Sequence, residues 1–362
     1  MNKIKICSPQ LGLNPNSNLG GEVHDHFIIQ NLAFYGNKVY VYLPQNRPYI
    51  KHVNIIASRA PIKHIPAIMF NLLIIPYLFK TYKKQKFNLI RVHNPYFIGP
   101  GAVLFKFFYK IPIIATYHLK EENIIFNLIN RIIINKFDGI IVVSNYLKKW
   151  LINKYKCNPE KIKVIYNGVD NSLKATGKNK KDNKFILLYI GILNDRKNPL
   201  FLLKVFEKFQ KDNEEAALVI CGKGPLKKKI INVIAQKRLK NVTLINEAYG
   251  INKQTLINNC DLFLFPSKNE GFGLAIVEAM RCRKPVLAMD NTSIRELVIN
   301  GYNGFLLPEN VEKWVEKIKI FKNDQEKLEK YGQQAYKFSL RFNWETAARE
   351  TFNYYYNVIQ NK

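Results

Sequence analysis

Short apolar runs alternate with helix-length segments along the whole chain. Most of these runs lack polar–apolar alternation and end in turn or polar residues. Such runs are typical of parallel strands covered on both faces, and the segments between them of crossover helices. The pattern predicts strands over residues 4–9, 38–44, 88–93, 112–118, 139–144 and 163–168 in the first half, and over 185–191, 217–224, 242–245, 262–267, 285–290 and 304–308 in the second.

Two such series predict an α/β protein with two doubly wound, Rossmann-like domains. Residues 171–184, NSLKATGKNKKDNK, are polar and lack apolar periodicity, which is typical of a linker. We therefore expect an N-terminal domain over residues 1–170 and a second domain over 185–335. The pattern turns helical after about residue 310, and we expect a C-terminal helix over 336–362 that packs back on the first domain.

The charge is large and unevenly distributed. The chain has 56 Lys and Arg against 27 Asp and Glu, a net charge of +29, and no acidic residue between Asp25 and Glu121. A basic N-terminal half favours an anionic partner: nucleic acid, a phosphorylated substrate or the inner leaflet of a membrane. An AT-rich genome, which encodes Lys, Asn and Ile freely, explains part of the total but not the acid-free window.

The longest apolar run is IPAIMFNLLIIPYLF (65–79), which KTYKKQK follows. Its 15 residues are fewer than the roughly 17–25 that span a bilayer. Two readings stay open: a helix packed on a sheet, or a helix face resting on anionic lipid. The basic, aromatic LFKFFYK (104–110) favours the second.

The compartment is indicated by what the sequence lacks. Five scattered cysteines form no C-x-x-C pair, and we find no signal peptide. We expect a cytoplasmic protein, with peripheral attachment to the inner face of the cell membrane as an option.

The stretch NEGFGLAIVEAM (269–280) carries the strongest chemical signal. It follows a predicted buried strand, and ligands of open parallel sheets bind at the carboxyl ends of the strands. Gly271 and Gly273 let a backbone approach a ligand, and amides at a helix N-terminus favour phosphate. Glu270 and Glu278 can accept hydrogen bonds from polyols. The stretch therefore offers backbone amides that can bind a diphosphate, between two acids that can bind hydroxyl groups. This combination suits a sugar nucleotide.

A second signal is YIGILNDRKNP (189–199), which places Arg196 and Lys197 after the first strand of the second domain. Two adjacent cations there can neutralise a diphosphate, Arg by a bidentate fork and Lys as a point charge. An RK pair alone is weak evidence in so basic a chain, and its position gives it weight.

The segment LFLFPSKNEGFGLAIVEAMRCRKPVLAMD, with RELVINGYNGFLL after it, resembles the glycosyltransferase family 4 group of retaining enzymes with the GT-B fold. The mark of that family is two glutamates separated by seven residues, matched by Glu270 and Glu278. VIYNGVD (164–170), VICGKGP (219–225) and the segment 18–42 are similar to family segments in the same order. The resemblance covers nearly the whole chain and is looser in the N-terminal domain.

The resemblance implies two domains facing a cleft, with the acceptor on the first and a nucleoside-diphosphate sugar on the second. Glu278 would hold the ribose hydroxyls. Glu270 would hold the donor sugar and diphosphate together with the amides around Phe272, Gly273 and Leu274. Lys197 matches the phosphate-binding lysine, Gly20 and Gly21 match a glycine loop near the diphosphate, and His118 matches a histidine near the transferred sugar.

Two positions depart from the family pattern. Ile192 stands where the family often has Arg, and we expect Arg196 to replace it. Asn246 stands where a glycine is common near the base pocket, so the nucleobase is not carried over. His118 also fits a polar residue that closes a buried strand, and His93 fits a structural role.

Retaining transfer could use a carboxylate nucleophile and a covalent intermediate. The resemblance instead favours a front-face reaction, in which the leaving diphosphate helps to take the acceptor proton. Glu270 and His118 are the expected catalytic positions, through placement of the sugar. We expect no cofactor and no required metal: His24, Asp25 and His26 in VHDHF should not converge on an ion, since neighbouring side chains diverge.

The expected partners are the donor and a glycan or lipid-linked acceptor in cell-envelope synthesis. Other readings are a synthase or phosphorylase of the same fold and an inactive relative acting as a partner subunit. A nucleic-acid-binding protein would need a binding module that we do not find, and a dehydrogenase would need a G-x-G-x-x-G that is missing.

Overall fold

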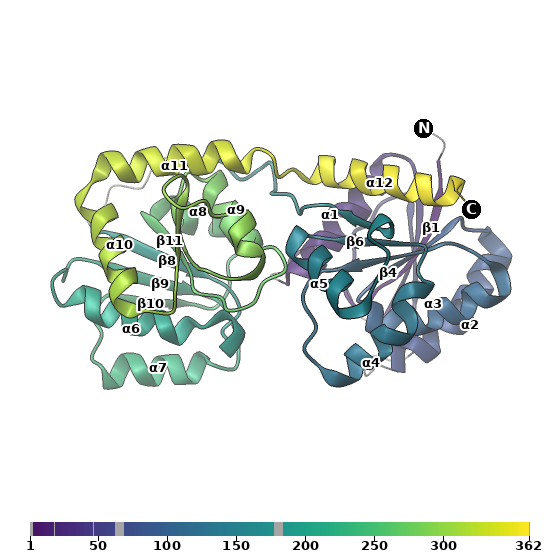
Figure 1. Cartoon of the computed structure of the whole chain (residues 1–362), viewed down its shortest axis with the longest axis horizontal. Helices are drawn as coiled ribbons and strands as arrows, with labels where there is room; N and C mark the ends of the chain where they lie inside the picture. The colour runs from purple at the N-terminus through teal and green to yellow at the C-terminus, as the bar shows by residue number, and fades with distance from the viewer. Residues whose placement is uncertain (1–2, 18, 46, 62–68, 177–183, 362) are drawn as a thin grey trace. The chain divides into compact units, whose positions relative to one another are not determined.

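The computed structural model describes residues 3–17, 19–45, 47–61, 69–176 and 184–361. The chain divides into two compact units, which we describe separately. Unit 1 comprises Met1–Gly168 with Trp344–Lys362, and unit 2 comprises Val169–Asn343. Each unit is a parallel sheet covered by helices on both faces (Figure 1). The predicted class, two doubly wound Rossmann-like domains, is confirmed.

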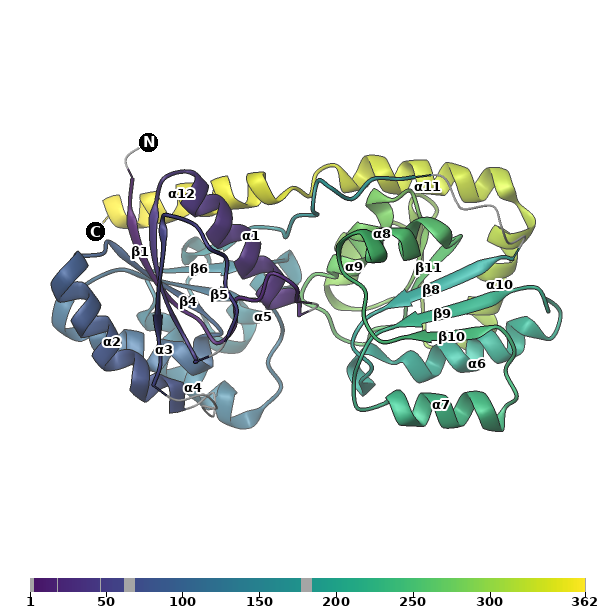
Figure 2. The same cartoon turned by 180° about the vertical axis from the view of Figure 1, so that it is seen from behind.

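The described residues of unit 1 form a seven-stranded parallel sheet in the order β3-β2-β1-β4-β5-β6-β7. Helices α1 and α12 cover one face, and α2, α3 and α4 lie on the other (Figures 1 and 2). The strands are β1 (Lys5–Pro9), β2 (Lys38–Leu43), β3 (Ile55–Arg59), β4 (Leu89–His93), β5 (Ile113–Tyr117), β6 (Gly139–Val142) and β7 (Ile162–Val164). The helices are α1 (Gly20–Phe34), α2 (Phe70–Gln85), α3 (Pro95–Tyr109), α4 (Ile124–Ile133), α5 (Asn145–Tyr155) and α12 (Trp344–Gln360).

Unit 2 repeats the scheme with a six-stranded parallel sheet in the order β10-β9-β8-β11-β12-β13. Its strands are β8 (Ile186–Ile190), β9 (Ala217–Cys221), β10 (Val242–Ile245), β11 (Leu262–Phe265), β12 (Val286–Met289) and β13 (Gly304–Leu307). Its helices are α6 (Pro199–Gln210), α7 (Lys227–Gln236), α8 (Gly250–Asn259), α9 (Leu274–Arg281), α10 (Val311–Asn323) and α11 (Gln325–Ser339). Its core includes the fully buried Trp314, whose indole Nε1 donates to the Pro308 carbonyl over 2.9 Å.

Local sequence explains where several helices begin. The Asn123 side chain accepts hydrogen bonds from the Ile125 and Phe126 amides at the start of α4. Asn310 and Asp324 cap α10 and α11 in the same way. Such caps satisfy amides that have no partner inside the helix. Proline begins α3 and α6, where its missing N–H costs nothing.

The structure differs from the predicted elements at two places. Strand β3 was not predicted, because it lies at the sheet edge and only its first residue is buried, so it lacks an apolar run. The helix expected over 336–362 is instead the end of α11 and the separate α12, with residues 340–343 between them. The predicted linker, 171–184, includes residues 177–183, which lie outside the described residues.

Candidate active site

Both predicted cations of unit 2 meet one of its two predicted acids, Glu270. Arg196 and Lys197 lie in the short 3-10 helix η4 (Asp195–Lys197) after β8, and Glu270 lies in the loop after β11. Strands β8 and β11 are neighbours, so their carboxyl ends share one edge of the sheet. One oxygen of Glu270, Oε1, accepts from Lys197 Nζ over 2.5 Å and from Arg196 Nη1 over 3.1 Å.

Further contacts fix the Glu270 carboxylate, which is 8% exposed. Ser267 Oγ donates to the same Oε1 over 2.5 Å, and Ser293 Oγ donates to the Glu270 carbonyl over 2.8 Å. Burial alone would raise the pKa of Glu270, but the charges of Lys197 and Arg196 and the bonds from Lys197 and Ser267 outweigh burial and lower that pKa. The carboxylate is therefore ionised at neutral pH.

The bend between the two glutamates has the backbone that its glycines predict. Gly273 has φ +106°, which side chains other than glycine rarely adopt, and caps α9. Leu274 begins the helix, so the amides of Gly273 and Leu274 have no partner inside the helix. Phe272 turns its ring into the core, 5.4 Å from the ring of Phe342. Only its backbone is available to a ligand.

Glu278 lies on the first turns of α9 and has a partner that the sequence did not reveal. Lys253 of α8 places its Nζ 2.6 Å from the Glu278 carboxylate. Both side chains are less than one-fifth exposed, at 18% and 13%. Among so many lysines, a single Lys on an amphipathic helix carries no signal of its own.

The candidate residues of unit 1 surround a buried histidine cluster. His118 follows β5, and its Nε2 lies 3.1 Å from Nδ1 of His93, at the end of β4. The ring of His24, on α1, lies 4.4 Å from that of His118, and its Nδ1 lies 2.8 Å from Asn167 Oδ1. The structure therefore packs His118 with two histidines whose connection to it the sequence did not indicate.

A buried ion pair contacts this cluster through His93. Arg91 and Asp25 have fully buried side chains and pair directly, and Asp25 Oδ1 lies 2.9 Å from His93 Nδ1. Burial would raise the pKa of Asp25, but the Arg91 charge beside it lowers that pKa below the usual range. Neither Arg91 nor Asp25 was predicted as a site residue.

The expectation for VHDHF is wrong in part. Ligand atoms of His24, Asp25 and His118 lie within 4.8 Å of one another, whereas His26 is not part of the group. The convergence arises because the end of β5 lies against the first turns of α1. Arg91 already neutralises Asp25, so the cluster is explained without an ion.

Gly20 and Gly21 begin α1 directly above this cluster. A Cβ built on Gly21 would lie 3.1 Å from His93 Nε2, which is tighter than ordinary contact. Glycine at this position therefore lets the helix N-terminus approach the histidines.

Comparison with known proteins places the chain in a family. Residues 20–173 match the family model described as Glycosyltransferase Family 4, and residues 171–338 match Glycosyl transferases group 1. An uncharacterised glycosyltransferase of Methanocaldococcus jannaschii is 31% identical over 285 residues, which cover 75% of this chain and 78% of the relative. The chain belongs to glycosyltransferase family 4.

Two further glycosyltransferases resemble this chain, one in sequence and one in structure. An N-acetylgalactosamine-N,N'-diacetylbacillosaminyl-diphospho-undecaprenol 4-alpha-N-acetylgalactosaminyltransferase of Campylobacter jejuni is 26% identical over 239 residues, 63% of this chain and 64% of that protein. The structure of HepE of Anabaena in complex with UDP-glucose matches with a TM-score of 0.77 at 20% identity, over 96% of this chain and 98% of that one. The fold is GT-B, and the chain is an enzyme of the hexosyltransferase class.

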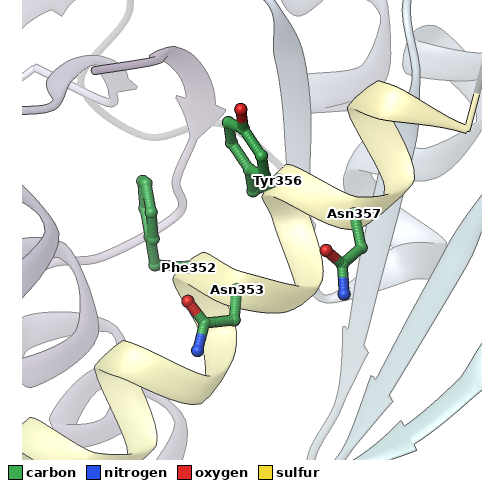
Figure 3. Close-up of a pocket in the computed structure, with 4 residues that line it drawn as sticks. All are labelled: Phe352, Asn353, Tyr356 and Asn357. Carbon is green, nitrogen blue, oxygen red and sulfur yellow. The ribbon is translucent and has the colours of Figure 1, made fainter. Parts of the chain in front are cut away.

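One cavity of the glycosyltransferase is lined by residues other than the candidate residues. A cavity on α12 is lined by Phe352, Asn353, Tyr356 and Asn357, and Figure 3 shows Phe352 and Tyr356 on one side of the helix. None of the predicted site residues lines it. In the described part of the chain, no helix is both long and apolar enough to cross a membrane.

Acid is expected to destabilise this glycosyltransferase through the histidine cluster. Burial lowers the pKa of His24 from 6.5 to about 3 and lowers that of His118 as well. Below pH 6.5 unfolded His24 binds a proton that folded His24 does not, so the free energy of unfolding falls between pH 6.5 and about 3, by up to about 1.4 kcal/mol per pH unit for this histidine. His118 acts in the same direction. Calorimetry should show a falling Tm over this range and a shallower fall in His24→Gln. A Tm independent of pH would contradict this.

Proposed function

We propose that this glycosyltransferase is a retaining enzyme that moves a sugar from a nucleoside-diphosphate sugar to a glycan or lipid-linked acceptor. Its place would be the inner face of the cell membrane, in the synthesis of cell-envelope polysaccharide or glycolipid. The observation that carries the proposal is the meeting of Arg196, Lys197 and Glu270 at the carboxyl ends of β8 and β11.

Arg196 and Lys197 supply charge for a diphosphate. Both side chains are mostly buried, at 30% and 14% exposed. Little water therefore competes with a phosphate for these cations, and the attraction between the charges is stronger than in bulk water. Glu270 pairs with both in the free protein and offsets one of their two charges. A bound diphosphate can take over their hydrogen bonds, which frees the carboxylate to accept from hydroxyls of the donor sugar. Arg196 lies in direct contact with Glu270, and in this proposal it takes the place of the family arginine that is absent at Ile192.

The proposed reaction proceeds on one face of the donor. The acceptor oxygen forms a bond to the anomeric carbon on the side from which the diphosphate leaves, and a diphosphate oxygen takes the acceptor proton. Negative charge that develops on the leaving group is stabilised by the two cations and by the amides around Gly273. The roles of Glu278 toward the ribose, and of His118, Gly20 and Gly21 toward the sugar and diphosphate, are part of this proposal.

The relatives support the substrate classes. The Campylobacter protein is named for a diphospho-undecaprenol acceptor, and the Anabaena structure holds UDP-glucose. We therefore expect a donor of the same chemical class here, with base and hexose to be identified by experiment.

A panel of UDP-, GDP- and ADP-sugars tests the donor assignment by thermal shift. At about 100 times its Kd, the right donor should raise Tm by about 5–10 °C. Lys197→Met should abolish the shift. The matched control is Lys208→Met, which removes the exposed ion pair between Lys208 on α6 and Glu312 on α10. This variant should keep the donor-induced shift. Equal shifts in both variants, or none with any donor in the unmodified protein, would refute the assignment.

A further inference from the structure

Helix α4 of unit 1 exposes a stripe of large aliphatic side chains. Ile124, Ile125, Leu128 and Ile132 are 76%, 58%, 55% and 73% exposed. Their spacing of three to four residues places them on one side of the helix, while Ile133 packs inward. Soluble surfaces carry scattered apolar residues, but a continuous stripe of this kind marks an interaction site.

The C-terminal half of α3 continues this apolar surface. Leu104, Phe107 and Phe108 are 47%, 82% and 61% exposed and share one side of α3, because their spacing is three and four residues. Phe105, between them, is buried, with its ring near those of Phe79 and Tyr82 on α2. The exposed residues of α3 therefore lie on a different side of the helix from Phe105.

Helices α3 and α4 lie side by side on the same face of the sheet (Figures 1 and 2). The rings of Phe97 and Phe126 lie 5.0 Å apart, and Lys106 Nζ donates to the Lys136 carbonyl over 2.7 Å. Since both helices bury their inner sides on one sheet, their exposed stripes form one surface. We name it the apolar face: Leu104, Phe107, Phe108, Ile124, Ile125, Leu128 and Ile132.

Exposed cations lie toward one end of this face. They lie at or near the C-terminal ends of α2, α3 and α4 and include Lys80, Lys83, Lys84, Lys86, Lys110, Arg131 and Lys136. The acidic groups next to it are already engaged: Asp138 pairs with Lys106, Glu121 accepts backbone amides, and Glu122 lies 4.0 Å from Lys120. A surface of apolar side chains next to exposed lysine and arginine matches a bilayer with anionic headgroups.

We propose that the apolar face inserts into the headgroup region of an anionic bilayer. This inference rests on the proposed function and names the surface through which the enzyme would meet a lipid-linked acceptor. The stripe of α4 begins a few residues after His118, at the carboxyl edge of the sheet, so the bilayer would lie near the candidate active-site end of unit 1. A second copy of the chain fits less well, because its cations would face the same cations.

The test is co-sedimentation with vesicles of phosphatidylcholine and phosphatidylglycerol, compared with vesicles of phosphatidylcholine alone. The full chain should bind the anionic vesicles and be released by salt. Leu128→Gln with Ile132→Gln should lower the affinity at least about 10-fold, as should Lys83→Gln with Lys84→Gln. Ile251→Gln, which changes an equally exposed isoleucine (69%) on α8 of unit 2, should bind like the unmodified protein.

Parallel measurements separate the two proposals. The donor-induced rise in Tm should be the same in the α4 double variant and the unmodified protein. Donor binding without vesicle binding, or vesicle binding unchanged by the α4 substitutions, overturns the membrane face and leaves the proposed function standing. Vesicle binding through the face without a response to any nucleotide sugar overturns the proposed function alone. A dimer that the α4 substitutions dissociate, with no vesicle binding, assigns the face to self-association instead.

Discussion

Replacing Glu270 by alanine should lower the rate of sugar transfer by at least about 100-fold, the scale at which a single charged group in a preorganised site acts. The carboxylate holds Arg196 and Lys197 and is the acceptor proposed for donor hydroxyls, so its loss removes both functions. Transfer of labelled sugar from the donor identified by thermal shift measures the effect. A near-normal rate in Glu270→Ala would rule out the donor-site assignment.

The same substitution affects stability, and this effect needs its own control. Without Glu270, two largely buried cations repel each other and lack a partner, which costs about 3 kcal/mol of unfolding free energy. Glu270→Gln keeps the shape and an oxygen that accepts from Ser267, but not the charge. We expect the glutamine variant, whose amide oxygen can still accept from Lys197, Arg196 and Ser267, to lose less stability than the alanine variant and to remain impaired in transfer. If the glutamine variant were fully active, the alanine defect would be one of folding.

The second large effect is expected at the ion pair beneath the histidines. Asp25→Asn should lower the free energy of unfolding by about 3–5 kcal/mol, because Arg91 would be left as a fully buried charge without a counter-ion. Urea unfolding followed by circular dichroism measures the change. Arg91→Met alone should cost a similar amount for the converse reason.

The double variant, Asp25→Asn with Arg91→Met, distinguishes a pair from two independent residues. It removes both charges together, so it should be less destabilised than the sum of the single variants by about 2 kcal/mol or more. Additive effects would show that the two side chains do not depend on each other. Because Asp25 also contacts His93, the single variants should disturb the histidine next to His118 as well.

The sequence predicted the frame of the site because strand ends are a strong positional rule. Apolar runs located β8 and β11, and the carboxyl ends of neighbouring parallel strands bring Arg196, Lys197 and Glu270 together. The sequence did not reveal which side chains pair, because nothing in the spacing indicates that Glu270 itself pairs with both cations. The same holds for Lys253 and Glu278, which lie on different helices.

Side chains contributed by several elements were the least predictable. The cluster around His118 takes His24 from α1, His93 from β4 and Asn167 from the segment after β7, and no local pattern links them. The apolar face was predicted only in part: LFKFFYK (104–110) contains Leu104, Phe107 and Phe108, but no pattern singled out α4. A lipid-facing helix was one reading of residues 65–79. Residues 65–68 lie outside the described residues, and Ile74, Tyr77 and Leu78 of α2 are buried. The amphipathic pattern of α4 does not say whether its apolar side is covered.

The central claim is that Arg196, Lys197 and the amides at the start of α9 bind the diphosphate of a nucleotide sugar. A crystal structure of the enzyme with the nucleoside diphosphate selected by thermal shift tests it most directly. The claim predicts phosphate oxygens within about 3 Å of Lys197 Nζ, the Arg196 guanidinium and the amides of Gly273 or Leu274. A nucleotide bound elsewhere on the chain, with both cations still paired to Glu270, would contradict it.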